Sequence, residues 1–318
     1  MTKGLVTVFG GSGFLGKHVV RALVKDGWRV RVPVRRPHTA QDLRVIGNVG
    51  QVQLMQANIR FRNSVIRAVE GSDAVVNLVS ILFEAGKQKF GSVHMTGAEN
   101  LALAAKMAGV TNFVQVSAIG ADKDSSSEYA HTKGLAEEHL QNEIPSADII
   151  RPSIMFGPED SFFNRFAKMA TMTPILPLIG GDTKFQPVYA GDVAQAIAKL
   201  LANGTSGETY ELGGPSTYTF KQLMQFTLET IDRKRFLAPV PWVGATALGM
   251  VGEIIGALPF VKPFLTRDQV TNLKQDNVVS DNAKSFSDLG IDLETIEAIV
   301  PPYLERYRKH GQFHEKIS

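Results

Sequence analysis

Three side chains that could carry out acid–base chemistry lie close together in the sequence. Tyr129 and Lys133 are four residues apart, a spacing that places both side chains on one face of a helix. Ser117 lies twelve residues before Tyr129, at the end of an apolar run. A tyrosine phenol has a pKa of about 10 when free, and a neighbouring ammonium group lowers that pKa by favouring the phenolate. Such a phenol can protonate a carbonyl oxygen during reduction while a serine hydroxyl holds that oxygen, so we expect Ser117, Tyr129 and Lys133 to be the catalytic residues.

A glycine-rich turn near the start of the chain could bind a cofactor. Gly10, Gly13 and Gly16 follow the apolar run 5–9 and precede a helix with apolar periodicity. Glycines at this spacing permit a tight turn, let backbone N–H groups approach a pyrophosphate and let the helix pack closely on the sheet. The helix N-terminus then favours an anion. The turn predicts dinucleotide binding by Gly10, Ser12, Gly13, Phe14, Leu15 and Gly16.

A P-loop is the competing interpretation of the same turn. Gly11, Gly16 and Lys17 have the required spacing, but His18 stands where a P-loop needs a Ser or Thr hydroxyl to bind magnesium. No apolar run that ends in an acid completes such a metal site. The sequence therefore favours a dinucleotide over a nucleoside triphosphate.

The residues that follow the turn indicate which dinucleotide binds. A site for NAD places an Asp or Glu about 20 residues beyond the turn, where it accepts a hydrogen bond from the ribose 2′-hydroxyl. Arg35 and Arg36 stand in that place, nineteen and twenty residues after Gly16. Guanidinium groups match phosphate oxygens and stack on adenine. We therefore expect NADP (NADPH), with both arginines on its 2′-phosphate; the alternative is a basic edge that faces only solvent.

The charge of the chain is unevenly distributed. The 318 residues have a net charge of +3, but residues 1–69 contain twelve Lys and Arg against two acids, Asp26 and Asp42. Such an excess calls for an anionic partner near the N-terminal region. The chain has no cysteine, which excludes disulfides, thiolate nucleophiles and a self-held iron–sulfur cluster. The seven histidines lack metal-ligand spacing and the basic region lacks interleaved aromatics, so we expect neither a metal nor nucleic acid.

These side chains must be positioned by the elements around them. Short apolar runs alternate with amphipathic helical windows, which predicts a parallel sheet covered on both faces. The expected fold class is α/β, a Rossmann-like doubly wound parallel sheet with a smaller C-terminal lobe. Strands are expected at 5–9, 29–34, 51–55, 74–79, 112–117 and 147–151, and helices at 14–26, 60–70, 89–108 and 129–143.

The pattern loosens after Arg151-Pro152, which predicts a domain boundary. We expect an NAD(P)-binding Rossmann domain over 1–150 and a C-terminal lobe over 151–318 that completes the fold. Within the lobe, the patterns predict helices at 191–202 and 219–232, a strand at 208–212, and a terminal helix that contains Tyr303, Tyr307 and Lys309.

The segment 236–265 is unusually apolar, with no charge between Phe236 and Gly252. Prolines and glycines interrupt it too often for a membrane span, which needs about 20 apolar residues. A helix over 242–258 would instead place an apolar stripe on one side. That stripe suits an interfacial or partner-docking face, and equally a pocket wall or the core of the lobe. Its members would be Val243, Ala247, Met250, Val251, Ile254 and Leu258.

The combined motifs resemble the extended or atypical branch of the short-chain dehydrogenase/reductase superfamily. The likeness rests on the glycine turn, on Ser117 with Tyr129 and Lys133, and on the stretches 151–158 and 187–194. It implies that Tyr129 and Lys133 also contact the cofactor. The further cofactor-binding residues that the resemblance implies are Asn58, Ile59, Leu78, Val79, Pro152 and Ile154.

Within that branch, the stretches 265–270 and 276–280 are similar to the C-terminal region of the nucleotide-binding accessory subunits of respiratory complex I and their bacterial relatives. This likeness implies a bound, structural NADPH, complex I subunits as partners, and a cytoplasmic location that allows peripheral contact with the inner membrane. His94 stands where many extended enzymes have Asn, and the loop from Ser117 to Tyr129 is short. Both departures argue against turnover and for a structural cofactor. The alternative is an active NADP-dependent reductase, epimerase or dehydratase acting on a sugar nucleotide, a steroid-like or a quinone-related substrate.

Overall fold

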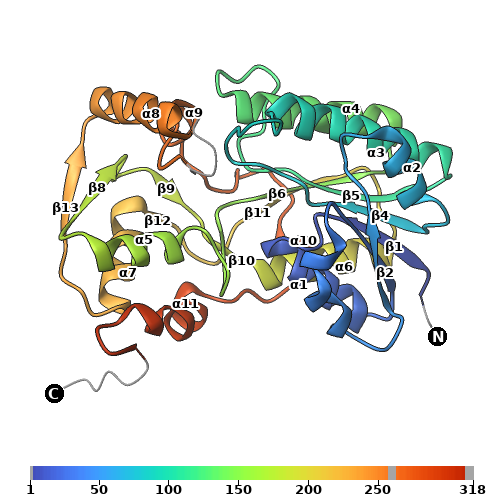
Figure 1. Ribbon diagram of the computed structural model, residues 1–318, viewed down its shortest axis with the longest axis horizontal. Helices are drawn as coiled ribbons and strands as arrows, with labels where there is room; N and C mark the ends of the chain where they lie inside the picture. Colours follow the sequence, from blue (N-terminus) through green and yellow to red (C-terminus); the bar gives the residue numbers. More distant parts are fainter. Residues whose placement is uncertain (1–2, 257–262, 312–318) are drawn as a thin grey trace. The chain divides into compact units, whose positions relative to one another are not determined.

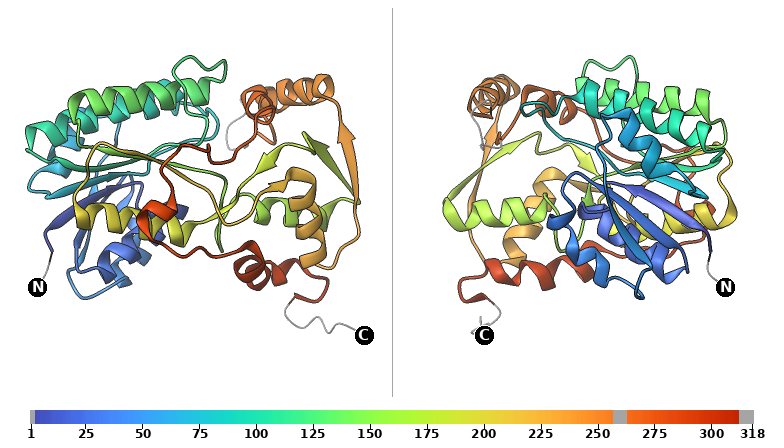
Figure 2. Two further views of the ribbon diagram at one scale, coloured as in Figure 1. Left: turned by 180° about the vertical axis from the view of Figure 1, so that it is seen from behind. Right: turned by 45° about the vertical axis from the view of Figure 1, so that its right-hand side comes forward.

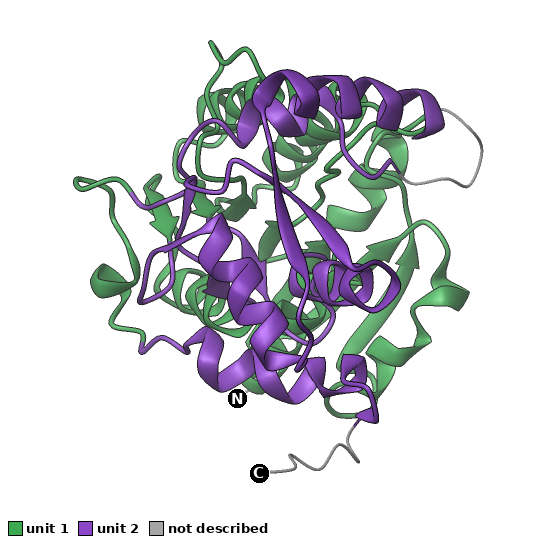
Figure 3. Cartoon of the chain, turned by 90° about the vertical axis from the view of Figure 1, so that its left-hand side faces the viewer, with its two compact units in different colours: residues 1–152, 191–212, 280–291 green, residues 153–190, 213–279, 292–318 purple. Residues whose placement is uncertain are grey.

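The computed structural model describes residues 3–256 and 263–311, which form two compact units. The chain passes from unit 1 to unit 2 between Pro152 and Ser153 and then returns twice to unit 1 (Figure 3). Both units are therefore assembled from three separate stretches of sequence. Unit 1 consists of residues 1–152, 191–212 and 280–291, and unit 2 of residues 153–190, 213–279 and 292–318.

A seven-stranded sheet forms the centre of unit 1, and every strand pair in it is parallel. The strand order is β11-β6-β5-β4-β1-β2-β3, so the chain winds outward in both directions from β1. This arrangement confirms the predicted Rossmann-like, doubly wound fold. The strands are β1 (Leu5–Phe9), β2 (Arg29–Val34), β3 (Val52–Gln56), β4 (Ala74–Asn77), β5 (Asn112–Val116), β6 (Asp148–Pro152) and β11 (Thr209–Leu212).

Helices cover both faces of this sheet because its strands carry apolar residues on both sides. Helices α2, α3 and α4 lie side by side on one face, and α1 and α6 lie on the other (Figures 1 and 2). The α-helices of unit 1 are α1 (Phe14–Lys25), α2 (Arg62–Val69), α3 (Thr96–Met107), α4 (Glu128–Glu143), α6 (Ala190–Asn203) and the short α10 (Phe286–Leu289). The first residue of α6 belongs to unit 2. Two 3-10 turns, η1 (Pro37–Thr39) and η2 (Gln41–Val45), follow β2.

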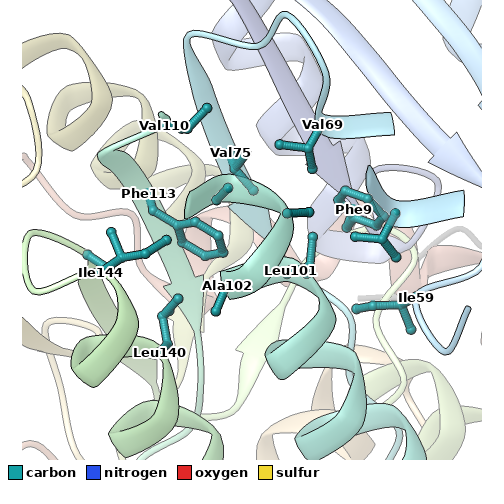
Figure 4. Close-up of a cluster of buried hydrophobic side chains, with 14 of the residues drawn as sticks. Phe9, Ile59, Val69, Val75, Leu101, Ala102, Val110, Phe113, Leu140 and Ile144 are labelled. Carbon is teal, nitrogen blue, oxygen red and sulfur yellow. The ribbon is translucent and has the colours of Figure 1, made fainter. Parts of the chain in front are cut away.

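The core under α2, α3 and α4 fixes how these helices sit on the sheet (Figure 4). Phe113 of β5 is fully buried beside Leu101 of α3 and Leu140 of α4. Burying one such large apolar side chain contributes about 1.5 to 3 kcal/mol. The packing thereby sets the direction in which α4 presents Tyr129 and Lys133.

Unit 2 has its own core, built from aromatic rings of α5 and α7 together with the apolar face of α11. The parallel pair of β8 and β13 lines this core on one side. The helices and strands of unit 2 are β7 (Met155–Phe156), α5 (Phe163–Met172), β8 (Ile175–Ile179), β9 (Lys184–Phe185), β10 (Val188–Tyr189), β12 (Tyr218–Thr219), α7 (Phe220–Thr230), β13 (Phe236–Val240), α8 (Trp242–Gly256), α9 (Arg267–Asn272), α11 (Ile296–Leu304) and the 3-10 turn η4 (Glu305–Tyr307).

The structure corrects two predicted helices. The helix expected over 89–108 begins as a π-helical turn, η3 (Gly91–Met95), and becomes α-helical only at Thr96. The terminal helix α11 ends at Leu304, so that Tyr307 falls in η4 and Lys309 beyond it. Across the described ranges 3–256 and 263–311, no helix combines the length and the apolar character needed to cross a bilayer.

Helix α8 turns its small residues toward the rest of unit 2 and its large apolar residues outward. A Cβ on Gly252 would lie 2.0 Å from the Leu265 carbonyl oxygen, and one on Gly249 would lie 2.9 Å from the Arg267 nitrogen. The helix therefore packs closely through its glycines, against the start of α9. The outward residues, which we call the α8 face, are Val243, Leu248, Met250, Val251, Ile254 and Ile255. Leu258, predicted on the same stripe, lies outside the described residues.

Candidate functional site

The glycine turn joins β1 to α1 in the geometry that the sequence predicts. Gly10 has a φ of +82°, and its carbonyl oxygen accepts a hydrogen bond of 2.9 Å from the Gly13 N–H. A Cβ on Gly16 would lie 2.2 Å from that same oxygen, so only glycine lets the first turn of α1 approach this closely. Gly13 caps α1 without a side chain, which leaves the first N–H groups of the helix without a side-chain acceptor.

A groove of about 270 Å³ opens beside this turn, at the carboxyl ends of β1 to β4. The sheet order changes direction at β1, and such switch points are where open α/β sheets bind ligands. Eight of the predicted cofactor residues line the groove: Gly10, Ser12, Gly13, Arg35, Asn58, Ile59, Leu78 and Val79.

The other predicted cofactor residues lie elsewhere. Leu15 and Gly16 are buried in the first turn of α1, beside the half-buried Phe14. Pro152 ends β6 in unit 1, where its carbonyl accepts a hydrogen bond from the Ile119 N–H. Ile154 belongs to unit 2, and its N–H donates to the Asn277 side-chain oxygen over 3.1 Å.

The two arginines predicted to bind a 2′-phosphate differ in their placement. The exposed Arg35 lines the groove and donates from Nη1 to Oε1 of Gln88 over 2.9 Å. Arg36 is also exposed but is not among the residues that line the groove, and its carbonyl accepts hydrogen bonds from the N–H and the hydroxyl of Thr39. Among the described residues that line the groove there is no Asp or Glu.

The three predicted catalytic residues come from β5 and α4. Ser117 directly follows β5, and its buried hydroxyl has no hydrogen-bond partner among the described residues. Lys133 is buried and donates from Nζ to the carbonyl of Val116, the residue before Ser117, over 3.1 Å. Burial lowers the pKa of Lys133 to about 8, although the Glu137 carboxylate opposes the shift. Tyr129 lies one turn before Lys133 on the same face of α4, as the four-residue spacing predicts, and is half-buried.

His94 connects the groove to this catalytic group. Its Nε2 accepts the N–H of Ile81 over 3.1 Å, so Nδ1 carries the proton and donates to the Thr132 hydroxyl over 3.1 Å. The Thr132 hydroxyl in turn donates to the Glu128 carbonyl. Burial and the nearby Lys133 charge lower the pKa of His94 to about 3, so the imidazole is neutral at physiological pH.

The His94 and Phe90 rings fix the position of Tyr129. The ring centroid of His94 lies 5.6 Å from that of Tyr129 at 81°, and that of Phe90 lies 5.9 Å away at 74°. Both are edge-to-face contacts, a favourable geometry for aromatic pairs. The π-helical turn that bears His94 therefore positions the Tyr129 ring from one side, a role that sequence reasoning did not assign to it.

Sequence reasoning also missed part of the groove. The turn after β3 and the loop after β4 contribute several unpredicted residues, and a search for charged side chains just after strand ends would have found Arg60. The unpredicted lining residues are Phe9, Pro33, Val34, Ala57, Arg60, Ser80, Ile81, Gln88 and Val93.

The residues present fit a nicotinamide dinucleotide. The glycine turn leaves room only for backbone, and the start of α1 offers N–H groups to a phosphate. Arg35 supplies a cation at the β2 end of the groove, and the unpartnered Ser117 hydroxyl lies at the end of β5. Within residues 3–256 and 263–311, no cluster of His, Asp or Glu has the arrangement of a metal site.

The sequence matches the NAD dependent epimerase/dehydratase family over residues 6–213, from β1 to just beyond β11. The chain belongs to this family. The match confirms the predicted resemblance to extended short-chain dehydrogenases/reductases, and it supports a nicotinamide cofactor in the groove.

Curated relatives of the chain extend the likeness through unit 2. The mitochondrial NADH dehydrogenase [ubiquinone] 1 alpha subcomplex subunit 9 of Arabidopsis thaliana is 36% identical, covering 96% of this chain and 79% of the relative. The mitochondrial NADH-ubiquinone oxidoreductase 40 kDa subunit of Neurospora crassa is 32% identical, covering 96% of this chain and 80% of the relative. These matches confirm the predicted likeness to accessory subunits of complex I.

Solved structures of the same fold cover nearly the whole chain. The NADPH-dependent quinone oxidoreductase of Escherichia coli, solved in complex with NADPH, has a TM-score of 0.72 at 22% identity and covers 94% of this chain and 99% of its own. At that identity the comparison shows the fold of this epimerase/dehydratase family member and not its activity.

Proposed function

We propose that this protein is an NADPH-binding accessory or assembly subunit of bacterial respiratory complex I. The observation that carries the proposal is the likeness to complex I subunits, which continues past residue 213, where the epimerase/dehydratase match ends, to 96% of the chain. Unit 2 is thus part of the likeness as well as the nucleotide-binding unit. We place the protein in the cytoplasm, on the cytoplasmic face of the inner membrane.

The groove supports NADPH over NADH as the bound form. A 2′-hydroxyl is held by a carboxylate acceptor, and none lines the groove among its described residues, whereas Arg35 offers a donor to a phosphate. Bound there, the dinucleotide would supply hydride-transfer chemistry. The chain itself would hold its phosphates at the start of α1 and its adenosine end beside Arg35.

Purification from native membranes tests this function. The tagged full-length protein should co-purify with complex I subunits and should release NADPH or NADP when denatured. A Tyr129→Phe variant should behave identically in both respects, because the phenol oxygen has no part in subunit assembly or in phosphate binding. Recovery of the protein from native membranes without any complex I subunit would contradict the proposal.

An active reductase, epimerase or dehydratase is the second candidate, and the catalytic group favours it. Lys133 donates to the carbonyl of Val116, the residue before Ser117, whose hydroxyl is unpartnered, and Lys133 is one helical turn from Tyr129. If this candidate holds, Tyr129→Phe abolishes substrate-dependent oxidation of NADPH but leaves NADPH bound. Assay of wild type and Tyr129→Phe against sugar nucleotides, steroids and quinones separates the two candidates.

We further propose that the α8 face lies on the membrane surface. Its six residues expose large apolar side chains, and the one charged residue of α8, Glu253, is paired with Arg267 over 2.9 Å. The aromatic rings of Trp242 and Phe264 are partly exposed, and aromatic side chains are typical of the bilayer interface. Apolar area of this kind favours insertion at the acyl boundary, with the cations Lys274 and Arg165 placed over the Trp242 and Phe264 rings.

Vesicle flotation tests this contact. The wild-type protein should float with vesicles of phosphatidylethanolamine and phosphatidylglycerol (3:1), and a Val251→Glu, Ile254→Glu double variant should lose at least about tenfold in partitioning, since each buried apolar side chain contributes about 1.5 to 3 kcal/mol. NADPH binding should be equal in both. Failure of the wild type to float, with complex I binding lost in the variant, would reassign the face to a protein contact.

A further inference from the structure

A second arginine shares the groove with Arg35. Arg60 follows β3, and Arg35 follows β2, its parallel neighbour in the sheet, in which Val34 is in register with Gln56. Both side chains line the groove. Arg60 is half-buried, so its position is more restricted than that of the exposed Arg35.

A short hairpin holds both guanidinium groups. Ala85 and Gln88 exchange two backbone hydrogen bonds of 3.0 and 2.9 Å, and Gly86 supplies the positive φ of +52° that the two-residue turn needs. Arg35 donates from Nη1 to the Gln88 side-chain oxygen over 2.9 Å. Arg60 donates from Nη1 to the Lys87 carbonyl over 2.5 Å.

The two acceptors, the Lys87 carbonyl oxygen and the Gln88 side-chain oxygen, belong to consecutive residues of the hairpin. The hairpin thus holds both arginines at the same end of the groove. A guanidinium has five N–H donors, and each of these hydrogen bonds uses one of them. Two cations that converge in this way, on a groove without a lining acid among its described residues, match the charge and the geometry of a phosphate dianion.

The base of the hairpin is anchored to the body of unit 1. The Glu84 carboxylate accepts the Phe90 N–H over 2.8 Å and pairs with Lys89 over 2.8 Å. Phe90 is itself buried against His94 and Tyr129. The hairpin is therefore held at both ends, by the arginines at its tip and by Phe90 at its base.

We propose that Arg60 and Arg35 together form a 2′-phosphate subsite, in which Arg60 determines the preference for NADPH over NADH. The proposal rests on the proposed function, because it assumes that a nicotinamide dinucleotide occupies the groove. It also changes the pair expected from the sequence, because Arg36 does not line the groove and its backbone caps the turn at Pro37–Thr39.

Binding measurements on the purified full-length protein test the subsite. NADPH and NADH affinities are measured by titration calorimetry for wild type and for Arg60→Gln, which keeps a donor for the Lys87 carbonyl but removes the charge. We expect NADPH affinity to fall about tenfold, as for the loss of a charge-assisted hydrogen bond, and NADH affinity to change less than about twofold. Adenosine 2′,5′-bisphosphate carries the 2′-phosphate and ADP does not. Used as competitors, they should show the same split in affinity, which then cannot come from the nicotinamide.

Arg67→Gln is the matched control for charge. Arg67 is exposed on α2 and does not line the groove, so its variant removes the same positive charge from the same basic region. Both nucleotide affinities should stay within about twofold of wild type. The loss of one distant positive charge has only a weak electrostatic effect, which salt screens. An Arg36→Gln variant should change the ratio of NADPH affinity to NADH affinity less than Arg60→Gln does.

Each outcome decides a separate claim. Equal losses of NADPH and NADH affinity in Arg60→Gln would mean that Arg60 supports the adenine or the groove wall, which overturns the subsite. An unchanged ratio of NADPH to NADH affinity in Arg60→Gln, or a larger change of that ratio in Arg36→Gln, would also overturn the subsite. Either result would leave NADPH binding itself intact. A wild-type protein that binds neither dinucleotide would overturn the proposed function and the subsite together.

Discussion

Replacing Gly16 with alanine should abolish dinucleotide binding, with a loss of affinity of about 100-fold or more. The added Cβ would lie 2.2 Å from the Gly10 carbonyl oxygen and 2.6 Å from two backbone atoms of Gly11. Backbone atoms cannot move aside as a flexible side chain can, so the turn must open and the start of α1 must shift away from the groove. Overpacking of this kind costs about 1 to 3 kcal/mol of stability, and a displaced anion-binding turn costs affinity in addition.

Titration calorimetry with NADPH, together with circular dichroism to verify the fold, measures this effect. Gly13→Ala should lose less affinity, since its Cβ would meet only the Gly10 oxygen, at 3.2 Å. Gly244→Ala in α8 is the matched control, because the nearest atom to its Cβ would be a Val240 methyl at 3.4 Å. That variant should bind as wild type does and should gain up to about 1 kcal/mol of helix stability. Wild-type affinity in Gly16→Ala would show that the turn does not hold the cofactor.

The parallel sheet and the glycine turn could be predicted because their signals are local. Leu5–Phe9 is a nearly continuous apolar run and Arg29–Val34 has a valine at every second position, and the structure places both strands where they were expected. Helix α4 likewise begins within one residue of its predicted start, where the Ser127 side chain caps it. Spacing along a regular element is enough to predict which side chains share a face, as for Tyr129 and Lys133.

The hairpin and the role of His94 could not be predicted, because they depend on contacts between distant residues. Arg60 meets Lys87 and Arg35 meets Gln88 only after the carboxyl ends of β2, β3 and β4 are brought to the same edge of the sheet. The π-helical turn at His94 has no sequence periodicity that distinguishes it from the α-helix that follows it. Contacts of this kind follow from the tertiary structure and not from local pattern.

The basic N-terminal region shows the same limit of sequence reasoning. Its excess of cations predicts an anionic partner, yet several of these residues are used within the fold. Arg31 donates to the carbonyls of Ala68 and Glu70 at the end of α2, and Lys3 pairs with Asp26 over 2.6 Å. Only Arg35 and Arg60 of the twelve line the groove. Net charge therefore predicts an anionic ligand, and the geometry decides which of the cations it meets.

Replacing Lys133 with methionine should stabilise the protein when no nucleotide is bound. The Lys133 ammonium is buried, and burial lowers its pKa from about 10.5 to about 8. A shift of that size means that the charged form costs the folded state about 3 kcal/mol below pH 8. Methionine keeps the unbranched apolar stem but loses the hydrogen bond to the Val116 carbonyl, which is worth about 1 kcal/mol. The free energy of unfolding at pH 7 should therefore rise by about 2 kcal/mol.

The pH dependence of this difference identifies its cause. Between pH 8 and 10.5 the folded wild type has released the Lys133 proton while the unfolded chain still holds it, so wild-type stability rises with pH across that window. The advantage of Lys133→Met should be complete below pH 8 and gone near pH 10.5. Urea unfolding of both proteins at pH 7, 9 and 10.5 measures it. Lys199→Met, at an exposed position on α6, should change stability by less than about 0.5 kcal/mol at each pH.

Nucleotide should reverse the order of the two proteins. A ligand that binds only the folded state adds about 2.7 kcal/mol when its concentration is 100 times its dissociation constant. If the Lys133 ammonium donates hydrogen bonds to the bound cofactor, wild type gains this full amount, and Lys133→Met, with weaker binding, gains less. Wild type should then be the more stable protein in saturating NADPH, although it is the less stable one without it. A variant that is less stable than wild type without nucleotide at pH 7 would show that the buried charge stabilises the fold. A variant that keeps its advantage in NADPH would show that Lys133 does not contact the cofactor.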